Sequence, residues 1–315
     1  MKFADPKNDL AFKKLFGDEE HSEILISFLN AVLDFKEEQA IVEVSLVNPY
    51  QVPRIPELKE TILDIKAKNQ KGESFIVEMQ KKDLGDFTKR SLYYTSKAYV
   101  EQLSKGKDYT RLKRVYFIGL LNFNIFENKN YISRHLIVNQ ETQTQDLSDF
   151  EFTFIELPKF NKPLEALESI LDKWIYFLKH AQDLTMIPQT YANLHTFQKA
   201  FSIVTQTSWN TKELELYDYI TLKEFDELNA LRTAERKGLQ KGLQQGIEKG
   251  LQEGLEKGLE KGLQQGIEKG VEKGLKQGVR EVARNLLKAN IPLETIVLST
   301  GLTKEEITSI EQERT

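Results

Sequence analysis

Two segments, TILDIKAK (61–68) and ESFIVEMQ (73–80), alternate between apolar and polar residues and decide the expected fold of the first half of the chain. Such alternation is typical of strands, because successive side chains in a strand point to opposite faces of the sheet. A short loop containing Gly72 separates the segments, so we predict an antiparallel hairpin. If its turn is centred on Lys71, paired residues have numbers that sum to 142, and Asp64 lies directly opposite Glu78.

The two faces of this hairpin differ in their chemistry. The odd-numbered positions are nearly all apolar and are expected to pack on the core: Thr61, Leu63, Ile65, Ala67, Phe75, Val77 and Met79. The even-numbered positions include most of the polar side chains: Asp64, Lys66, Lys68, Glu78 and Gln80. Directly opposed carboxylates have Cβ atoms roughly 5 Å apart and repel one another. A divalent cation between them would remove the repulsion. From the pattern alone, however, the favoured interpretation is that the two acids simply face solvent.

The surrounding sequence indicates a mixed α/β domain. A helix is expected from Asn8 to Leu33, broken near Gly17, because apolar residues recur there at helical spacing. A second helix is expected at residues 86–104. Apolar or alternating runs indicate further strands at IVEVSLV (41–47), VYFIGLLNF (115–123), SRHLIVN (133–139) and FTFIEL (152–157).

The second half of the chain loses the strand signal. Amphipathic helices are expected at residues 164–181 and 216–237. Glycine then occupies every fourth position from Gly238 to Gly278, each followed by Leu, Ile or Val. We expect one long helix over residues 238–280, about 65 Å long at about 1.5 Å per residue, that projects from the first domain and promotes self-association; a length-variable linker is the equally weighted alternative. The tail, residues 293–310, has helix-turn-helix character with its turn at Gly301.

Composition excludes several classes of protein. The chain of 315 residues contains no cysteine, so disulfides and thiolate zinc sites are excluded, and a cytoplasmic location is expected. The four histidines lack the spacing of a zinc hydrolase, and no P-loop occurs. No apolar run of about 18 residues is present, so no membrane partner is expected, and the N-terminal segment shows no secretory signal.

Several segments together resemble the PD-(D/E)XK nuclease family whose members are described as transposases or recombination-promoting nucleases. They are NDLAFKKLFG (8–17), ILISFLNAVL (24–33), LKETILDIKAKNQKGESFIVEMQ (58–80), the helix with Arg90, Tyr93 and Tyr94, GKDYTRLKRVYFIGLLNFNIF (106–126) and the glycine-repeat tail. The resemblance implies an α/β fold with a restriction-endonuclease-like core and a mixed central sheet, then a helical annex and a long glycine-repeat helix. The expected domains are residues 1–160 (nuclease core), 161–237 (annex), 238–280 (repeat helix) and 281–315 (small helical module).

The resemblance also implies the site residues. Asp64 and Glu78 match the two acids of the family motif, and with the backbone carbonyl of Met79 they would bind Mg²⁺ or Mn²⁺. Gln80 stands where the strict motif has lysine, and it could orient a water but carries no charge. Lys66, on the same face, is a candidate for the missing charge. Asp9 matches the family's opening motif, although helix capping is its favoured interpretation.

The charge distribution supports DNA as a partner. Between Lys59 and Arg114 the chain has 14 Lys and Arg against 8 Asp and Glu, a net of +6, whereas the whole chain has a net charge of −4. The expected DNA-binding residues are Lys66 and Arg90, the latter because it matches the helix of the family that the chain resembles. Further candidates for phosphate contacts are Lys81, Lys82, Lys89 and Lys97, although a solvated helix face is the favoured interpretation for any one lysine.

The expected function is that of a Mg²⁺-dependent deoxyribonuclease, an endonuclease that hydrolyses phosphodiester bonds in DNA recombination or mobile-element processes. A homo-oligomer formed through the C-terminal repeat is expected. The alternative is a catalytically inactive DNA-binding or oligomeric interaction protein that retains the nuclease fold, because Gln80 departs from the motif.

Overall fold

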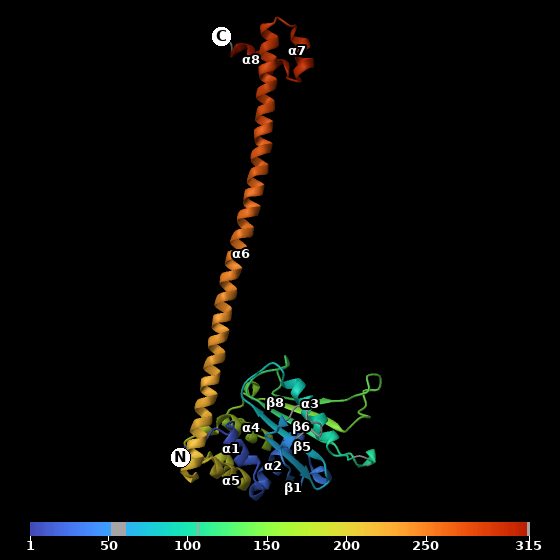
Figure 1. The fold of residues 1–315 in the computed structure, drawn as a ribbon, viewed down its shortest axis with the longest axis vertical. Coiled ribbons are helices and arrows are strands. Elements are labelled where there is room, and N and C mark those ends of the chain that lie inside the picture. The colour runs from blue at the N-terminus through green and yellow to red at the C-terminus, as the bar shows by residue number, and fades with distance from the viewer. Residues whose placement is uncertain (52–60, 105, 107, 314–315) are drawn as a thin grey trace. The chain divides into compact units, whose positions relative to one another are not determined.

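The computed structural model describes the chain apart from residues 52–60, 105, 107 and 314–315 and the side chains of Gln51 and Thr61 (Figure 1). The expected position of Thr61 on the apolar face therefore lies outside the described residues. The chain divides into two compact units, Met1–Glu227 and Leu228–Thr315. Helix α6 (Thr211–Lys288) begins in the first unit and ends in the second.

A six-stranded mixed sheet lies at the centre of the first unit. Its strands follow the order β1 (Val44–Leu46), β4 (Ile65–Asn69), β5 (Ser74–Gln80), β6 (Val115–Leu121), β8 (Phe150–Glu156) and β7 (Ile132–Leu136). Strands β5, β6 and β8 are parallel to one another, and the remaining neighbours are antiparallel. Helix α3 (Phe87–Val100) makes the crossover from β5 to β6 that a parallel pair requires. The mixed central sheet expected from the sequence is confirmed.

The register of the central hairpin is also as predicted. Ile65 pairs with Val77, and Lys68 pairs with Ser74, so the numbers of each pair sum to 142. The turn between the strands includes Gly72, whose φ of +77° lies in the region that favours glycine. Register follows here from the length of the turn together with the apolar alternation.

The alternation breaks at Asp64, however. Residues 61–62 form β3 (Thr61–Ile62), which pairs with β2 (Tyr50–Gln51) in a separate two-stranded sheet, and β4 begins only at Ile65. Leu63 is buried in the cluster beneath α3, whereas Ile65 is buried on the opposite face of the sheet. The expectation of one continuous strand over residues 61–68 is therefore wrong, because the bend at Asp64 reverses which face Leu63 reaches.

Helices cover both faces of the sheet (Figure 1). One face, with Phe75 and Val77, belongs to a large hydrophobic cluster with α1 (Asp9–Phe16), α2 (Ser22–Leu33), α4 (Ile170–His180) and α5 (His195–Val204). The other face, with Ile76 and Phe117, packs against α3. The expected break of the first helix near Gly17 is confirmed, since α1 ends at Phe16.

The helices after residue 163 share the core of the sheet. Trp174 of α4 and Phe197 of α5 are fully buried in the same cluster as Phe28 and Val77. Helix α4 begins at Ile170, later than the sequence indicates, because Ser169 and Asp172 form a capping box that fixes its first turn. The expected boundary between a core and an annex near residue 160 stays a prediction, since packing continues across it.

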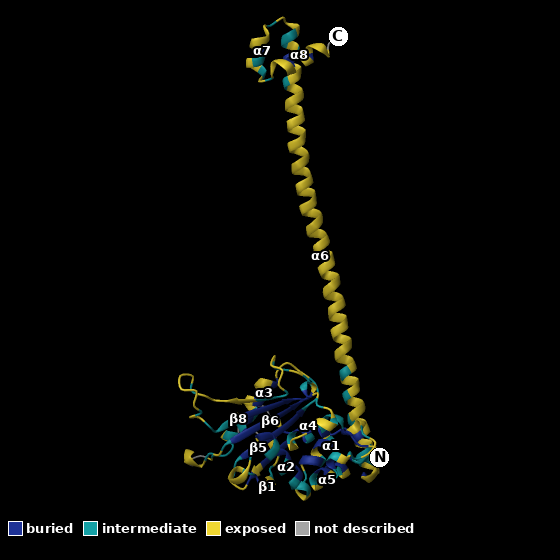
Figure 2. Ribbon diagram, turned by 180° about the vertical axis from the view of Figure 1, so that it is seen from behind, coloured by how far each residue is buried: buried dark blue, intermediate teal, exposed yellow. Residues whose placement is uncertain are grey.

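In the second unit, α6 carries the glycine repeat as one uninterrupted helix, so the predicted helix over residues 238–280 is confirmed. The Leu, Ile and Val side chains that follow the glycines are all exposed from Leu239 to Leu275 (Figure 2). A period of four residues advances about 40° beyond a full turn at each step. The apolar side chains therefore follow a spiral, and the position of this helix relative to the first unit stays a prediction.

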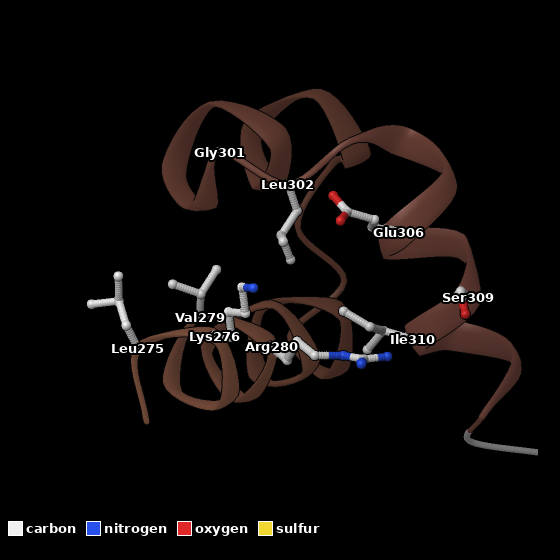
Figure 3. A pocket seen from close by; sticks show the side chains of 9 residues that line it. All are labelled: Leu275, Lys276, Val279, Arg280, Gly301, Leu302, Glu306, Ser309 and Ile310. Atoms are coloured by element: carbon white, nitrogen blue, oxygen red, sulfur yellow. The ribbon is translucent and has the colours of Figure 1, made fainter. Parts of the chain in front are cut away.

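Two short helices, α7 (Leu293–Thr300) and α8 (Lys304–Gln312), pack against the end of α6. Ala283, Ile296, Ile307 and Ile310 form their small core, and Gly301, with φ of +72°, makes the turn that the sequence indicates. A cavity of about 420 Å³ lies between α6 and the loop and helix that begin at Gly301 (Figure 3). None of the helices in the described part of the chain is long and apolar enough to cross a membrane.

Candidate active site

Asp64 occupies the bend directly before β4, where the strand pairing of the hairpin ends. Its backbone amide donates a hydrogen bond to Oε1 of Glu78 at 3.1 Å. Its own carboxylate oxygen Oδ2 accepts a hydrogen bond from the backbone amide of Met79 at 2.7 Å. At this point, hydrogen bonds from backbone amides to carboxylate oxygens take the place of the backbone hydrogen bonds between the two strands. These bonds bring Asp64, Glu78 and Met79 together, as the sequence predicts.

Glu78 is almost completely buried, with 3% of its surface exposed. Besides the amide of Asp64, its carboxylate accepts a hydrogen bond from Nε2 of Gln80, which lies 3.3 Å from Oε2. Among the described residues, no Lys, Arg or His forms an ion pair with Glu78 or with Asp64. Glu78 is therefore a buried carboxylate that has hydrogen-bond donors but no cationic partner, a situation that disfavours its charged form.

The electrostatic environment raises the pKa of both carboxyl groups. Burial, followed by the negative charge of Asp64, raises the pKa of Glu78 from 4.5 to about 8. Burial has the largest effect on the pKa of Asp64, and the negative charge of Asp9 also raises it. Together they raise this pKa from 3.8 to about 6. Two neighbouring carboxyl groups with raised pKa values favour binding of a proton or of a metal cation.

Gln80 and Arg90 extend this arrangement away from the sheet. An Nη atom of Arg90 donates to Oε1 of Gln80 at 3.2 Å, while the amide nitrogen of Gln80 faces Glu78. The guanidinium of Arg90 also forms an ion pair with Asp86, at 2.9 Å, and lies over the ring of Phe87. Arg90, expected to bind DNA, is therefore directed at the motif residue Gln80 in this structure.

A cavity of about 220 Å³ opens beside Asp64. Asp9 and Phe12 of α1, Met79 and Gln80 of β5, and the residues that follow β5 line it together with two acids of α6. Asn8 caps α1, because its side chain accepts a hydrogen bond from the amide of Leu10. The interpretation of Asp9 as the cap is therefore wrong; Asp9 lies in the first turn, paired with Lys13, beside Asp64.

Lys66 does not point towards the two carboxylates. It is only 8% exposed and forms an ion pair with Glu101, at 2.8 Å, after the end of α3. Its even-numbered position suggested that Lys66 could supply positive charge at the site, but its ammonium lies against the end of α3 instead. Of the other basic candidates, Lys89 is exposed on α3.

Lys81 and Lys82 line the cavity, but acidic side chains already hold them. Lys81 forms ion pairs with Asp5 at 3.2 Å and with Glu224 at 2.6 Å. Lys82 pairs with Glu227 at 3.0 Å and donates a hydrogen bond to the backbone carbonyl of Glu224. Sequence reasoning missed these acids, since more than 140 residues separate Glu224 from Lys81 and no local pattern connects them.

The donor set fits a divalent cation. Hard cations such as Mg²⁺ prefer carboxylate and carbonyl oxygens, and one or two protein carboxylates are sufficient. The pair Asp64 and Glu78 provides them, and Glu78 has no cation of its own. Within the described part of the chain, no group of three or more His, Asp or Glu side chains is arranged as a metal site. A backbone carbonyl, such as that of Met79, would complete the ligands.

An α/β core with a mixed sheet whose hairpin holds two neighbouring acids is the arrangement of restriction-endonuclease-like nucleases. Residues 6–234 match the family described as PD-(D/E)XK nuclease family transposase. The match spans more than half of the chain, so the chain belongs to this family. Comparisons with curated proteins and with solved structures gave no match.

Proposed function

We propose that this chain is a Mg²⁺- or Mn²⁺-dependent endonuclease that hydrolyses phosphodiester bonds of DNA. The observation that supports this most directly is Glu78, a buried carboxylate beside Asp64 without a cationic partner. Retaining such a group is unfavourable in a core that has only a structural purpose. A site that binds a cation and then a polyanionic substrate gives the carboxylate pair a use.

In the proposed reaction, Asp64, Glu78 and the carbonyl of Met79 would hold the metal ion. When bound, the ion supplies Lewis acidity and lowers the pKa of a water ligand. Gln80 donates a hydrogen bond to Glu78 and so fixes the orientation of that carboxylate. Water adds to phosphorus, the ester bond to one strand end breaks, and that oxygen leaves with a proton. Lys81 and Lys82 line the cavity where phosphate oxygens of the backbone would lie.

The test is nicking of supercoiled plasmid by the full chain with Mg²⁺ or Mn²⁺. Asp64→Asn keeps the size of the side chain and removes its charge, so activity should fall by about two orders of magnitude or more. The matched control is Asp226→Asn, which makes the same chemical change at an exposed position of α6. Equal nicking by wild type and Asp64→Asn would show that the activity is contamination and would refute the proposal.

A second candidate is a DNA-binding or interaction protein that keeps the fold but not the catalysis. Gln80 favours it, because the motif lysine is absent. Calorimetric titration with Mn²⁺ separates the two: the enzyme requires binding that is lost in Glu78→Gln, whereas the inactive protein does not. Plasmid binding without nicking and without such metal binding would support this second candidate.

We also propose self-association through the repeat, and a role in recombination or mobile-element processes. The exposed Leu, Ile and Val spiral on α6 supports association, because burying it between chains would be favourable by roughly 25 cal/mol for each Å². Light scattering of the full chain and of a chain ending at Glu235 tests this. The shorter chain retains the whole first unit, Met1–Glu227, including the ion pair of Glu227 with Lys82. Equal monomeric masses for both over micromolar concentrations would leave the repeat as a linker.

A further inference from the structure

We propose that Arg90 is a positioning residue that, through the amide of Gln80, supplies the positive charge which the motif lysine would provide. This inference deepens the proposed nuclease function and rests on it. The structure shows a chain of two hydrogen bonds, from Arg90 to Oε1 of Gln80 and from Nε2 of Gln80 to Glu78, at 3.2 and 3.3 Å. Arg90 thus reaches the carboxylate pair by way of residue 80.

The chemistry of the two groups sets the direction of these bonds. A guanidinium only donates hydrogen bonds, so it must face the oxygen of the Gln80 amide. The NH₂ group of Gln80 is then directed at Glu78, where a carboxylate can only accept. A charged donor on the amide oxygen polarises the amide and strengthens the N–H donor at its other end. The pair therefore presents a polarised donor where a lysine would present an ammonium.

Arg90 is held for this purpose from several sides. Asp86, one helical turn earlier, pairs with it, and the guanidinium lies 5.2 Å from the ring centre of Phe87, which is buried. Phe87 itself packs against Phe154 and Phe117 at the centre of the second face of the sheet. A guanidinium that is restrained by an ion pair and by contact with a ring retains little conformational freedom. Substrate binding therefore costs little further side-chain entropy at Arg90.

Other cations near the site are engaged elsewhere. Lys66 pairs with Glu101, and Lys81 pairs with Asp5 and Glu224. Lys13, whose charge acts on Asp64, pairs with Asp9. Arg90 also has an ion-pair partner, Asp86, but it lies near both acids of the motif and lowers the pKa of each, against the larger effect of burial.

The first experiment measures catalysis in full-length variants with Mn²⁺. Arg90→Gln should lower kcat for plasmid nicking on the order of 100-fold with little change in KM. The double variant Gln80→Lys with Arg90→Gln should regain most of that loss, since the lysine then carries the charge directly. Gln80→Ala with Arg90→Gln should not regain it. Arg111→Gln, which removes an exposed cation from the same basic segment, is the matched control.

A different result would overturn the proposal. If Arg90 instead binds a DNA phosphate, Arg90→Gln should raise KM, reduce the salt dependence of binding by about one ion, and gain nothing from Gln80→Lys. Unchanged kinetics in Arg90→Gln would also refute the proposal that Arg90 acts through Gln80. Melting temperatures of all variants show whether a loss reflects unfolding.

The second experiment does not need activity. In ¹⁵N-glutamine-labelled protein, the side-chain NH₂ signal of Gln80, identified by its loss in Gln80→Ala, should move towards the position of free amides in Arg90→Gln and stay in Arg111→Gln. No movement would overturn the Arg90–Gln80 link. If the signal moves but wild type and Asp64→Asn nick equally, the link holds while the proposed nuclease function fails.

Discussion

Glu78→Gln should change how the stability of the protein depends on pH. The pKa of Glu78 is raised from 4.5 to about 8, mainly by burial. A group whose pKa is raised in the folded state stabilises that state while it is protonated, below the unfolded pKa, and this contribution is lost as pH rises towards the folded pKa. In the absence of metal, the wild-type free energy of unfolding should therefore fall between about pH 5 and about pH 7.5.

The size of the effect follows from the size of the shift. One pKa unit corresponds to about 1.4 kcal/mol, so Glu78 alone destabilises the folded state by roughly 3 kcal/mol across that interval. Asp64, with its pKa raised to about 6, adds a smaller loss in the same direction. Glutamine has no charge to bury, so the variant should retain roughly 3 kcal/mol that the wild type loses. Its NH₂ group would face that of Gln80, which lowers stability by about 1 kcal/mol at every pH.

The measurement is urea unfolding, with EDTA, of wild type, Glu78→Gln and the control Glu127→Gln, which alters an exposed carboxylate. For each protein, the free energy of unfolding at about pH 5 is subtracted from that at about pH 7.5. These changes are then compared between proteins, because the destabilisation that Glu78→Gln causes at every pH cancels. Excess Mn²⁺ at the higher pH should restore stability to the wild type, by about 2.7 kcal/mol at one hundred times the dissociation constant, and not to Glu78→Gln. Parallel pH curves for wild type and Glu78→Gln would show that this carboxyl is not buried without a cationic partner.

Three further changes have defined outcomes. Gly119→Ala should lower the free energy of unfolding by about 1–3 kcal/mol, since an added Cβ would lie 2.9 Å from a ring carbon of Phe87; unchanged denaturation midpoints would contradict the packing. Joint replacement of Glu224 and Glu227 by Gln should free Lys82 from its ion pair and leave Lys81 paired with Asp5 alone, and so raise DNA affinity several-fold with a steeper salt dependence, as measured by fluorescence anisotropy; weaker binding would contradict this expectation. Gly254→Ala, at a position with open space around it, should stabilise α6 by about 1 kcal/mol, seen as a higher helix melting temperature by circular dichroism; a loss of mass in light scattering would show that the glycine is needed for association.

Local pattern was sufficient for the paired residues of the central hairpin and for most of the elements around it. Alternation and the turn at Gly72 predicted which residues pair, and the observed pairing of Ile65 with Val77 agrees. Helical periodicity predicted α1 and α2, because burial of one face imposes a period of 3.6 on the sequence. The repeat helix was predicted from its regular glycine spacing instead, since its apolar side chains are exposed. The resemblance at Asp64, Glu78 and Gln80 placed these three residues at one site, and the structure brings them together.

Contacts between distant segments were decided only by the tertiary structure. The bend at Asp64, which sends Leu63 to the face under α3, breaks a period that the sequence continues without interruption. The partner of Lys66 was not visible in the hairpin, and the acids that hold Lys81 and Lys82 come from a helix that begins at Thr211. Periodicity indicates which side of an element is buried. The ion-pair partner of a charged side chain, in contrast, depends on which distant segments the fold brings next to it. The sequence by itself therefore determined most of the elements of the central sheet, the register of its hairpin and the motif acids, whereas packing decided where the chain bends at Asp64 and which cations lie close to those acids.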